Sequence, residues 1–170
     1  MRRILLFLAV GLFSASASAY NSFDPSTTIL PWKNGPTRDA VIDFGQHSNS
    51  VFVLEASANF CGYCKENAVN VNELTETHMD DERVLVADLS IDSQEREIRQ
   101  WISSTNPNHP VLHDVGRTVW DQLKQDRYIP QVFVADCEGN LVYSHVGVWS
   151  DAVKREINHA IAEAKTVTCD

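Results

Sequence analysis

Residues 59–65 read Asn-Phe-Cys-Gly-Tyr-Cys-Lys, with two residues between Cys61 and Cys64. The run Val51-Phe-Val-Leu-Glu-Ala56 precedes this stretch, and its length and apolar character predict a strand covered on both faces. Apolar residues at helical spacing after Cys64 predict a helix over residues 61–79. The cysteine pair is therefore expected at the turn from a buried strand into a helix.

Strands and helices alternate through the rest of the chain. We predict strands at 83–88, 131–136 and 141–146, a short extended piece at 107–112, and helices that begin at Asp92, after Asp114 and at Ser150. The last two strands are joined by Cys-Glu-Gly-Asn, which is typical of a tight hairpin. This alternation predicts a three-layer α/β/α domain with a central mixed sheet.

Capping residues and apolar spacing predict where the helices begin and which of their residues face the core. Asp92 followed by Glu95 is a capping-box pattern, and Ser150 is expected to cap the last helix. The apolar residues at helical spacing are Ile98, Trp101 and Ile102, then Val115, Val119 and Leu123, then Val153, Ile157, Ile161 and Ala164. This spacing also predicts that Trp101 and Trp120 pack in the core.

The first 19 residues have the pattern of an export signal. Arg2 and Arg3 give a positive start, residues 4–13 are apolar, and Ala17-Ser18-Ala19 is a small-residue cleavage site. The apolar run is shorter than the roughly 20 residues that span a bilayer, although a retained anchor is the alternative. We predict cleavage before Tyr20. Residues 20–50, rich in Pro, Ser, Asn and Thr, would then form an irregular lead-in with one short strand, ahead of a single domain over residues 51–170.

The exported chain is expected to be acidic. Cleavage removes two arginines and no acidic residue, so the formal net charge changes from −9 to −11. This charge repels phosphate backbones, so we expect no nucleic-acid partner. The four cysteines all lie after the signal, and an even count in an exported protein is compatible with two disulfides.

The position of the cysteine pair favours redox chemistry. A thiolate at a helix N-terminus faces unpaired backbone N–H groups and the positive end of the helix dipole, which lowers the pKa of Cys61. We therefore expect Cys61 to be the nucleophile and Cys64, one turn further on, to resolve the mixed disulfide. Gly62 lets the backbone of a partner approach. A metal site is one alternative, but the pair is accompanied by no second Cys-x-x-Cys and no His-x₃₋₅-His. A purely structural disulfide is the other, and so small a loop stabilises little.

The chain resembles the thioredoxin superfamily, and within it the exported TlpA/ResA-like thiol–disulfide oxidoreductases. The resemblance covers about residues 40–165, and three segments carry it: residues 51–65, the Tyr128-Ile129-Pro130-Gln131 turn, and residues 108–116. It implies a thioredoxin-like three-layer fold with a cis peptide bond before Pro130. Asp88 and Pro130 are 42 positions apart, about double the separation in a minimal thioredoxin. The resemblance accounts for this surplus by a TlpA-like extra helix and strand.

Glu55 lies six residues before Cys61, inside an otherwise apolar strand. Burial of this carboxyl would raise its pKa towards neutrality, so that it could exchange a proton with Cys64 through water. The resemblance supports this role, because thioredoxin and protein disulfide isomerase hold a buried acid at the same position. A glutamate at the strand end that reaches solvent is the alternative.

The resemblance also implies a surface for an extended substrate. The backbone of Ile129, held by Pro130, would pair with the substrate as an added strand, although an ordinary trans proline that begins a strand is the alternative. Phe60 and Tyr63 are expected to form an apolar rim, with packing of Phe60 into the protein as the alternative. Lys65 is interpreted as a solvated surface lysine.

Two departures from the family pattern leave the direction of electron flow open. Phe60 stands where the family usually has Trp, and Tyr63 where it usually has Pro. The resulting Cys-Gly-Tyr-Cys is the tetrapeptide of the periplasmic disulfide isomerase. That isomerase also has an N-terminal dimerisation domain, which residues 20–50 are too short to supply, so we expect a monomer.

The two remaining cysteines are expected to form a structural disulfide. Cys137 lies in the turn of the last hairpin, and Cys169 follows the final helix, which should run back towards that turn. Two unpaired buried thiols are the alternative. The histidines His109, His113, His145 and His159 have no consistent ligand spacing and are expected at the surface or at helix caps.

Together these features predict an exported thiol–disulfide oxidoreductase whose partners are protein thiols and disulfides. No bound organic cofactor is expected, because the dithiol itself carries two electrons. The resemblance favours a reductant recharged by a membrane electron donor. The alternatives are a disulfide oxidase or isomerase, a copper-carrying metallochaperone, and a non-catalytic binding module.

Overall fold

The computed structural model describes residues 21–169. The predicted export signal and its cleavage site before Tyr20 lie outside these residues. The strands are β1 (Ile29–Pro31), β2 (Val41–Asp43), β3 (Val51–Ser57), β4 (Val84–Ser90), β5 (Val111–His113), β6 (Gln131–Ala135) and β7 (Leu141–Val146). The helices are α1 (Gly62–His78), α2 (Glu95–Thr105), α3 (Thr118–Leu123) and α4 (Asp151–Ala164), with short 3₁₀ helices at Pro25–Thr27 and Phe44–His47.

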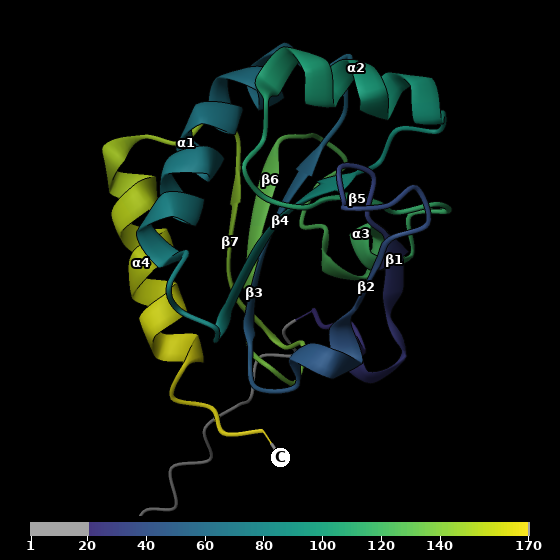
Figure 1. The fold of residues 1–170 in the computed structure, drawn as a ribbon. Helices are drawn as coiled ribbons and strands as arrows, with labels where there is room; N and C mark the ends of the chain where they lie inside the picture. The colour runs from purple at the N-terminus through teal and green to yellow at the C-terminus, as the bar shows by residue number, and fades with distance from the viewer. Residues whose placement is uncertain (1–20, 170) are drawn as a thin grey trace, which may run out of the picture.

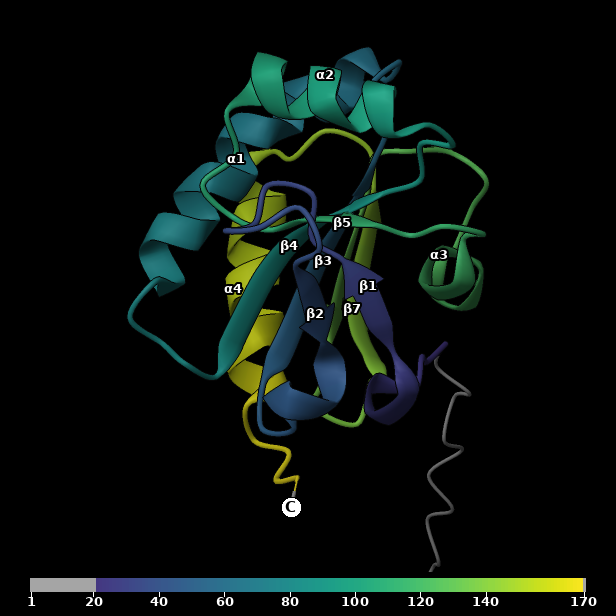
Figure 2. The same ribbon diagram turned by 45° about the vertical axis from the view of Figure 1, so that its right-hand side comes forward.

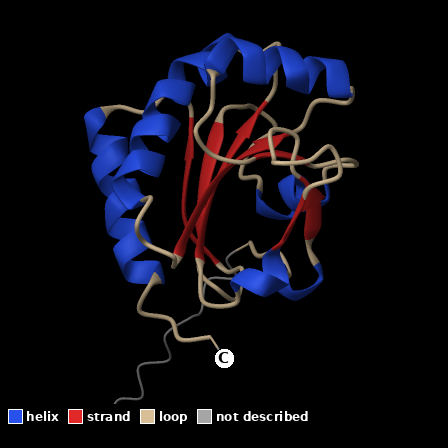
Figure 3. Ribbon diagram, in the orientation of Figure 1, coloured by secondary structure: helices blue, strands red, loops and turns tan. Residues whose placement is uncertain are grey.

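A five-stranded mixed sheet forms the centre of the domain, as the alternating pattern predicts (Figures 1 and 3). Its strand order is β5-β4-β3-β6-β7. The strands β5, β4 and β3 are parallel, whereas β6 and β7 run antiparallel to β3 and to each other. This is the thioredoxin-like α/β fold expected from the resemblance, and α2, β5 and α3 lie between β4 and β6, where the extra helix and strand were expected.

Apolar residues cover both faces of the sheet, which explains why the central strands have few polar positions. Helices α1 and α4 pack on one face, where side chains such as Val71, Leu74 and Ile157 meet the valines of β3, β4 and β6. Helix α3 covers the other face, where Trp120 and Leu123 pack against Phe133 and its neighbours. Figure 2 shows these layers from the side, with α2 across the upper end of the sheet.

The lead-in is more ordered than the sequence predicts. Residues 21–50 contain two strands rather than one, and β1 and β2 pair antiparallel as a small separate sheet. Four apolar side chains of this segment are buried, namely Phe23, Leu30, Ile42 and Phe44. The ring of Phe44 packs against the ring of Phe52 in β3. The lead-in therefore forms part of the core on the α3 side, which its polar composition conceals.

Two predicted helix starts are wrong in detail. Helix α2 begins three residues after Asp92, and its capping box is Gln94 with Glu97 rather than Asp92 with Glu95. Asp92 instead accepts hydrogen bonds from the loop before Cys61. Helix α3 begins at Thr118, so Val115 is exposed in the preceding loop and not on an inner helical face.

The hairpin turn between β6 and β7 packs closely on the lead-in. Gly139 has a φ of +82°, and a Cβ atom at this position would lie 2.0 Å from the backbone oxygen of Phe23. Only glycine fits this turn without displacing the backbone of the lead-in at Phe23. Cys137, in the same turn, forms a disulfide with Cys169 beyond α4. None of the described helices is both long and apolar enough to cross a membrane.

Removing the Cys137–Cys169 bridge is expected to lower stability without changing redox activity. The two cysteines are 32 positions apart, and closing a loop of this length stabilises by roughly 3 kcal/mol in the chain-entropy model. We expect a Cys137→Ala/Cys169→Ala variant to lose about that much in urea unfolding of the oxidised protein. A loss below about 0.5 kcal/mol, or mass mapping that finds both thiols free in the exported protein, would reject a structural role.

Candidate active site

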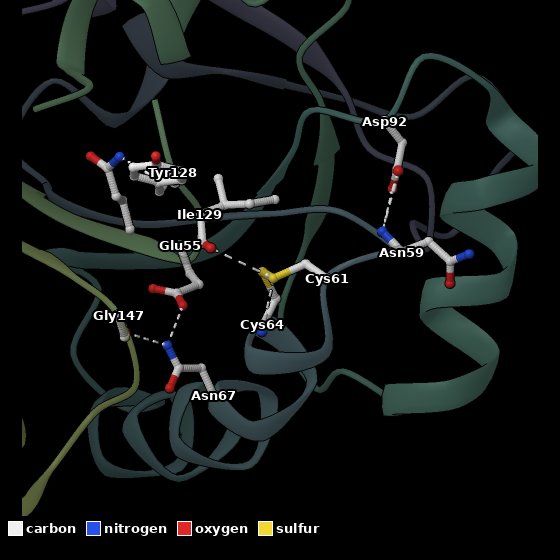
Figure 4. Close-up of a disulfide and its surroundings, with 10 residues drawn as sticks. Glu55, Asn59, Cys61, Cys64, Asn67, Asp92, Tyr128, Ile129 and Gly147 are labelled. Carbon is white, nitrogen blue, oxygen red and sulfur yellow. Dashed lines mark hydrogen bonds between the residues drawn. A yellow bond between two sulfur atoms is a disulfide. The ribbon is translucent and has the colours of Figure 1, made fainter. Parts of the chain in front are cut away.

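Cys61 and Cys64 form a disulfide at the N-terminus of α1 (Figure 4). Cys61 is the N-cap residue, and its Sγ accepts a hydrogen bond from the backbone N–H of Cys64 at 3.0 Å. Cys61 is 8% exposed, whereas Cys64 is 1% exposed. An incoming group therefore reaches Cys61 more easily, and the N-terminal N–H groups of the helix are placed to stabilise negative charge on its sulfur.

The loop before Cys61 is held by Asp92, a residue whose role the sequence pattern misassigned. Both carboxylate oxygens of Asp92 accept hydrogen bonds from the backbone N–H of Asn59, at 3.2 and 3.0 Å. The hydroxyl of Ser90 donates to the same carboxylate. Burial raises the pKa of Asp92, and the hydrogen bonds from Asn59 and Ser90 oppose that rise. Asp92 thereby fixes the position of the turn that presents Cys61.

The Ile129–Pro130 turn lies beside the disulfide. The peptide bond between these residues is cis, and the carbonyl oxygen of Ile129 lies 3.8 Å from Sγ of Cys61. An open groove of about 390 Å³ adjoins this turn. The groove is lined by Tyr63, Tyr128, Ile129, Pro130, Val146 and Val148. It is therefore an apolar surface beside the Ile129 turn, whose carbonyl oxygen contacts the more exposed cysteine.

The other residues predicted around the cysteine pair do not line this groove. Phe60 is 78% exposed and does not line it, although it directly precedes Cys61. Gly62 has open space where a Cβ would lie, so nothing in the fold requires glycine there. Lys65 is exposed on α1.

Glu55 is buried, at 2% exposure, and lies in the surroundings of the disulfide (Figure 4). Its Oε1 accepts a hydrogen bond of 2.8 Å from the side-chain amide of Asn67, and Figure 4 shows the Glu55 carboxyl group directed towards that amide. Burial raises the pKa of Glu55 to about 8, the charge of Asp88 adds to the rise, and the Asn67 hydrogen bond opposes it. A carboxyl with this pKa can both accept and return a proton near neutral pH.

Asn67 is a site residue that the sequence reasoning missed. Its Nδ2 donates to Glu55 and to the backbone oxygen of Gly147, and its Oδ1 accepts from the backbone N–H of Trp149 at 2.9 Å. Asn67 thus ties α1 to Glu55 and to the segment after β7 that forms one wall of the groove. The available signal was a polar residue on the buried face of the predicted helix, three positions after Cys64.

Two histidine predictions are corrected by the structure. His109 and His113 are buried rather than at the surface. The Nε2 of His113 lies 2.9 Å from the backbone oxygen of Asp92, and the Nε2 of His109 lies 3.3 Å from the carboxylate of Asp88. Across residues 21–169, no three His, Cys, Asp or Glu side chains are grouped so that they could hold a metal ion.

Comparison with known proteins agrees with this geometry. Residues 34–144 match the model of the AhpC/TSA family, and the chain belongs to that family. A search of curated proteins found no match. Family, fold and the Cys61–Cys64 disulfide together define a thioredoxin-like thiol–disulfide oxidoreductase.

Solved structures with this fold come from several bacteria. A Chlorobium tepidum protein assigned as a thiol:disulfide interchange protein DsbE has a TM-score of 0.68 and 22% identity, over 86% of this chain and 99% of that one. A secreted Mycobacterium tuberculosis disulfide oxidoreductase homologous to E. coli DsbE has a TM-score of 0.62 and 14% identity, over 82% and 97%. StoA from Bacillus subtilis has a TM-score of 0.60 and 13% identity, over 78% and 96%.

Proposed function

We propose that the protein is an exported reductant that exchanges its Cys61/Cys64 dithiol with disulfides of partner proteins. The observation that carries this proposal is the more exposed Cys61 at a helix N-terminus, with the buried carboxyl of Glu55, whose pKa is raised, in the surroundings of the cysteine pair. Export is supported by the sequence of residues 1–19 and by the secreted M. tuberculosis protein of similar fold.

The proposed reaction has two displacements. The Cys61 thiolate attacks one sulfur of the substrate disulfide, and the other substrate sulfur leaves as a thiolate that takes up a proton. Glu55 then accepts the proton of the Cys64 thiol, so that the Cys64 thiolate can attack Sγ of Cys61. The second substrate sulfur leaves, the Cys61–Cys64 disulfide forms, and the substrate has gained two electrons. A membrane electron donor would return the protein to its dithiol form.

Substrate docking is proposed for the groove beside Cys61. An extended segment of a partner protein would pair with the backbone of Ile129 and place apolar side chains against Tyr63, Tyr128 and Val148. The size and apolar lining of the groove suit an unfolded or flexible segment better than a small polar metabolite. The contact requires one copy of the chain, consistent with a monomer.

Tyr63 is the residue that favours the second candidate, a disulfide oxidase or isomerase, because the Cys-Gly-Tyr-Cys tetrapeptide resembles that of the periplasmic isomerase. The reduction potential of the Cys61/Cys64 couple, measured against glutathione, separates the two directions. A value near −270 mV is expected for a reductant, and a value near −120 mV would identify an oxidant instead. Copper retained at one ion per chain after dialysis of the reduced protein would favour the metallochaperone.

A further inference from the structure

A second buried carboxylate, Asp88, lies beside Glu55. The two residues are paired in the parallel register of β3 and β4, so their side chains point to the same face of the sheet. Asp88 is 1% exposed and Glu55 2% exposed. Two carboxylates at adjacent positions in a dry interior resist simultaneous ionisation, because each negative charge raises the energy of the other.

The groups around Asp88 tie it to the floor of the active site. Its Oδ2 accepts a hydrogen bond of 2.7 Å from the indole N–H of Trp101 in α2, and Nε2 of His109 lies 3.3 Å away. Trp101 belongs to the same buried cluster as Cys61 and Cys64. Trp101 is therefore not only a core residue, as its helical spacing suggested, but also the donor that orients Asp88.

Few other charges can balance the two carboxyl groups. The neighbouring strand residues are apolar, with Val132 opposite Glu55 and Val111 opposite Asp88. From α1 the titratable group on this side is Cys64, and from the segment before β5 it is His109. Among the described residues, Glu55 Oε2 and Asp88 Oδ1 have no hydrogen-bond donor. Asp88 Oδ1 is thus without a donor that would stabilise its charge, and for Glu55 the side chain of Trp149 acts with Asn67 to lower the pKa.

We propose that Glu55 and Asp88 act as one carboxylate pair, and that Asp88 thereby controls the protonation of Glu55 during thiol–disulfide exchange. The inference rests on the proposed function. When Cys64 loses its proton, the pair takes it up on Glu55, and the proton is released after the Cys61–Cys64 disulfide has formed. Asp88 does not contact the reacting sulfurs, so it is a positioning residue that acts through Glu55.

Carboxyl NMR of the oxidised, carbon-13-labelled protein tests the pairing without requiring activity. In Asp88→Asn, an amide replaces the charge while its oxygen can still accept from Trp101. We expect the titration midpoint of Glu55 to move to lower pH by about one unit. The matched control is Asp136→Asn, which removes a buried carboxylate in the turn at the opposite end of β6 and should leave the midpoint unchanged. An unchanged midpoint in Asp88→Asn overturns the inference.

The wild-type protein gives a second test in case Asp88→Asn does not fold. If the two groups form one pair, the Asp88 carboxyl signal responds at the midpoint of Glu55. Independent titration of the two signals overturns the inference. Kinetics test whether the pair acts in thiol–disulfide exchange. In folded Asp88→Asn, the pH profile of the rate at which Cys64 resolves the mixed disulfide should shift in the same direction as the Glu55 midpoint. If Asp88→Asn is fully active and its pH–rate profile is not shifted, only the proposed role of Asp88 is refuted. If the wild-type protein has no activity, the proposed function itself is refuted.

Discussion

Replacing Cys61 with serine is expected to abolish insulin reduction, with a loss of at least about 1,000-fold, because no other thiol is placed to begin the exchange. Cys64→Ser should behave differently. Its Cys61 can still attack, but the mixed disulfide cannot be resolved and should accumulate. Non-reducing gels of each variant after incubation with oxidised insulin would detect this adduct in Cys64→Ser and not in Cys61→Ser.

The control for this experiment is the Cys137→Ala/Cys169→Ala variant, which removes the other disulfide and keeps the active-site pair. It should retain the insulin-reducing activity of the wild type at temperatures where it remains folded. Adduct formation by Cys61→Ser through Cys64 would reverse the assigned roles of the two cysteines. Equal activity in all the variants would show that neither cysteine carries the reaction.

Glu55→Gln is expected to change stability in a pH-dependent way. The carboxyl titrates near 4.5 in an unfolded chain and at about 8 in the folded protein. Between these values the folded state binds more protons than the unfolded state, so wild-type stability falls as pH rises through this window. The full effect is about 3–5 kcal/mol for a shift of this size. Glutamine cannot ionise, so the free energy of unfolding of Glu55→Gln should not fall with pH in this way. Relative to the wild type, the variant should therefore become more stable as the pH rises from 5 to 8.

Urea unfolding of the oxidised protein at several pH values measures this difference without interference from free thiols. The matched control is Glu66→Gln, which removes an exposed carboxylate from α1 and should leave the pH dependence of the wild type in place. The same Glu55→Gln change should slow the Cys64-dependent step, because the group that accepts its proton is lost. A stability difference that stays constant from pH 5 to pH 8 would contradict a raised pKa for Glu55.

The regular strands and helices were predictable because the spacing of apolar residues follows which side chains are buried. The continuous run at 51–56 is β3, and the spacing after Cys64 gives α1 to within one residue at each end. Ser150 caps α4 as expected, with its side chain accepting from the backbone N–H of Val153. The lead-in was less predictable, because Phe23, Ile42 and other isolated apolar residues reach the core from a polar segment without any period.

Polar contacts between distant segments account for the errors at the site. Asp92 matches a capping pattern, but its carboxylate is used by the backbone of Asn59, which lies 33 positions earlier. His109 has no ligand spacing and looks like a surface residue, yet it is buried against Asp88. Asn67 joins Glu55 to the segment after β7. Such partners depend on tertiary contacts, so a local pattern cannot identify them.

The central claim is that the sulfur of Cys61 is ionised and reachable at the head of α1. The most direct measurement is the rate of alkylation of each thiol by iodoacetamide across a pH series, with the modified residue identified by mass spectrometry. Cys61 should react first, with a midpoint below the roughly 8.5 of an unperturbed cysteine, and Cys64 should stay protected. If both thiols react no faster than free cysteine at every pH, the cysteine pair is not an activated redox site.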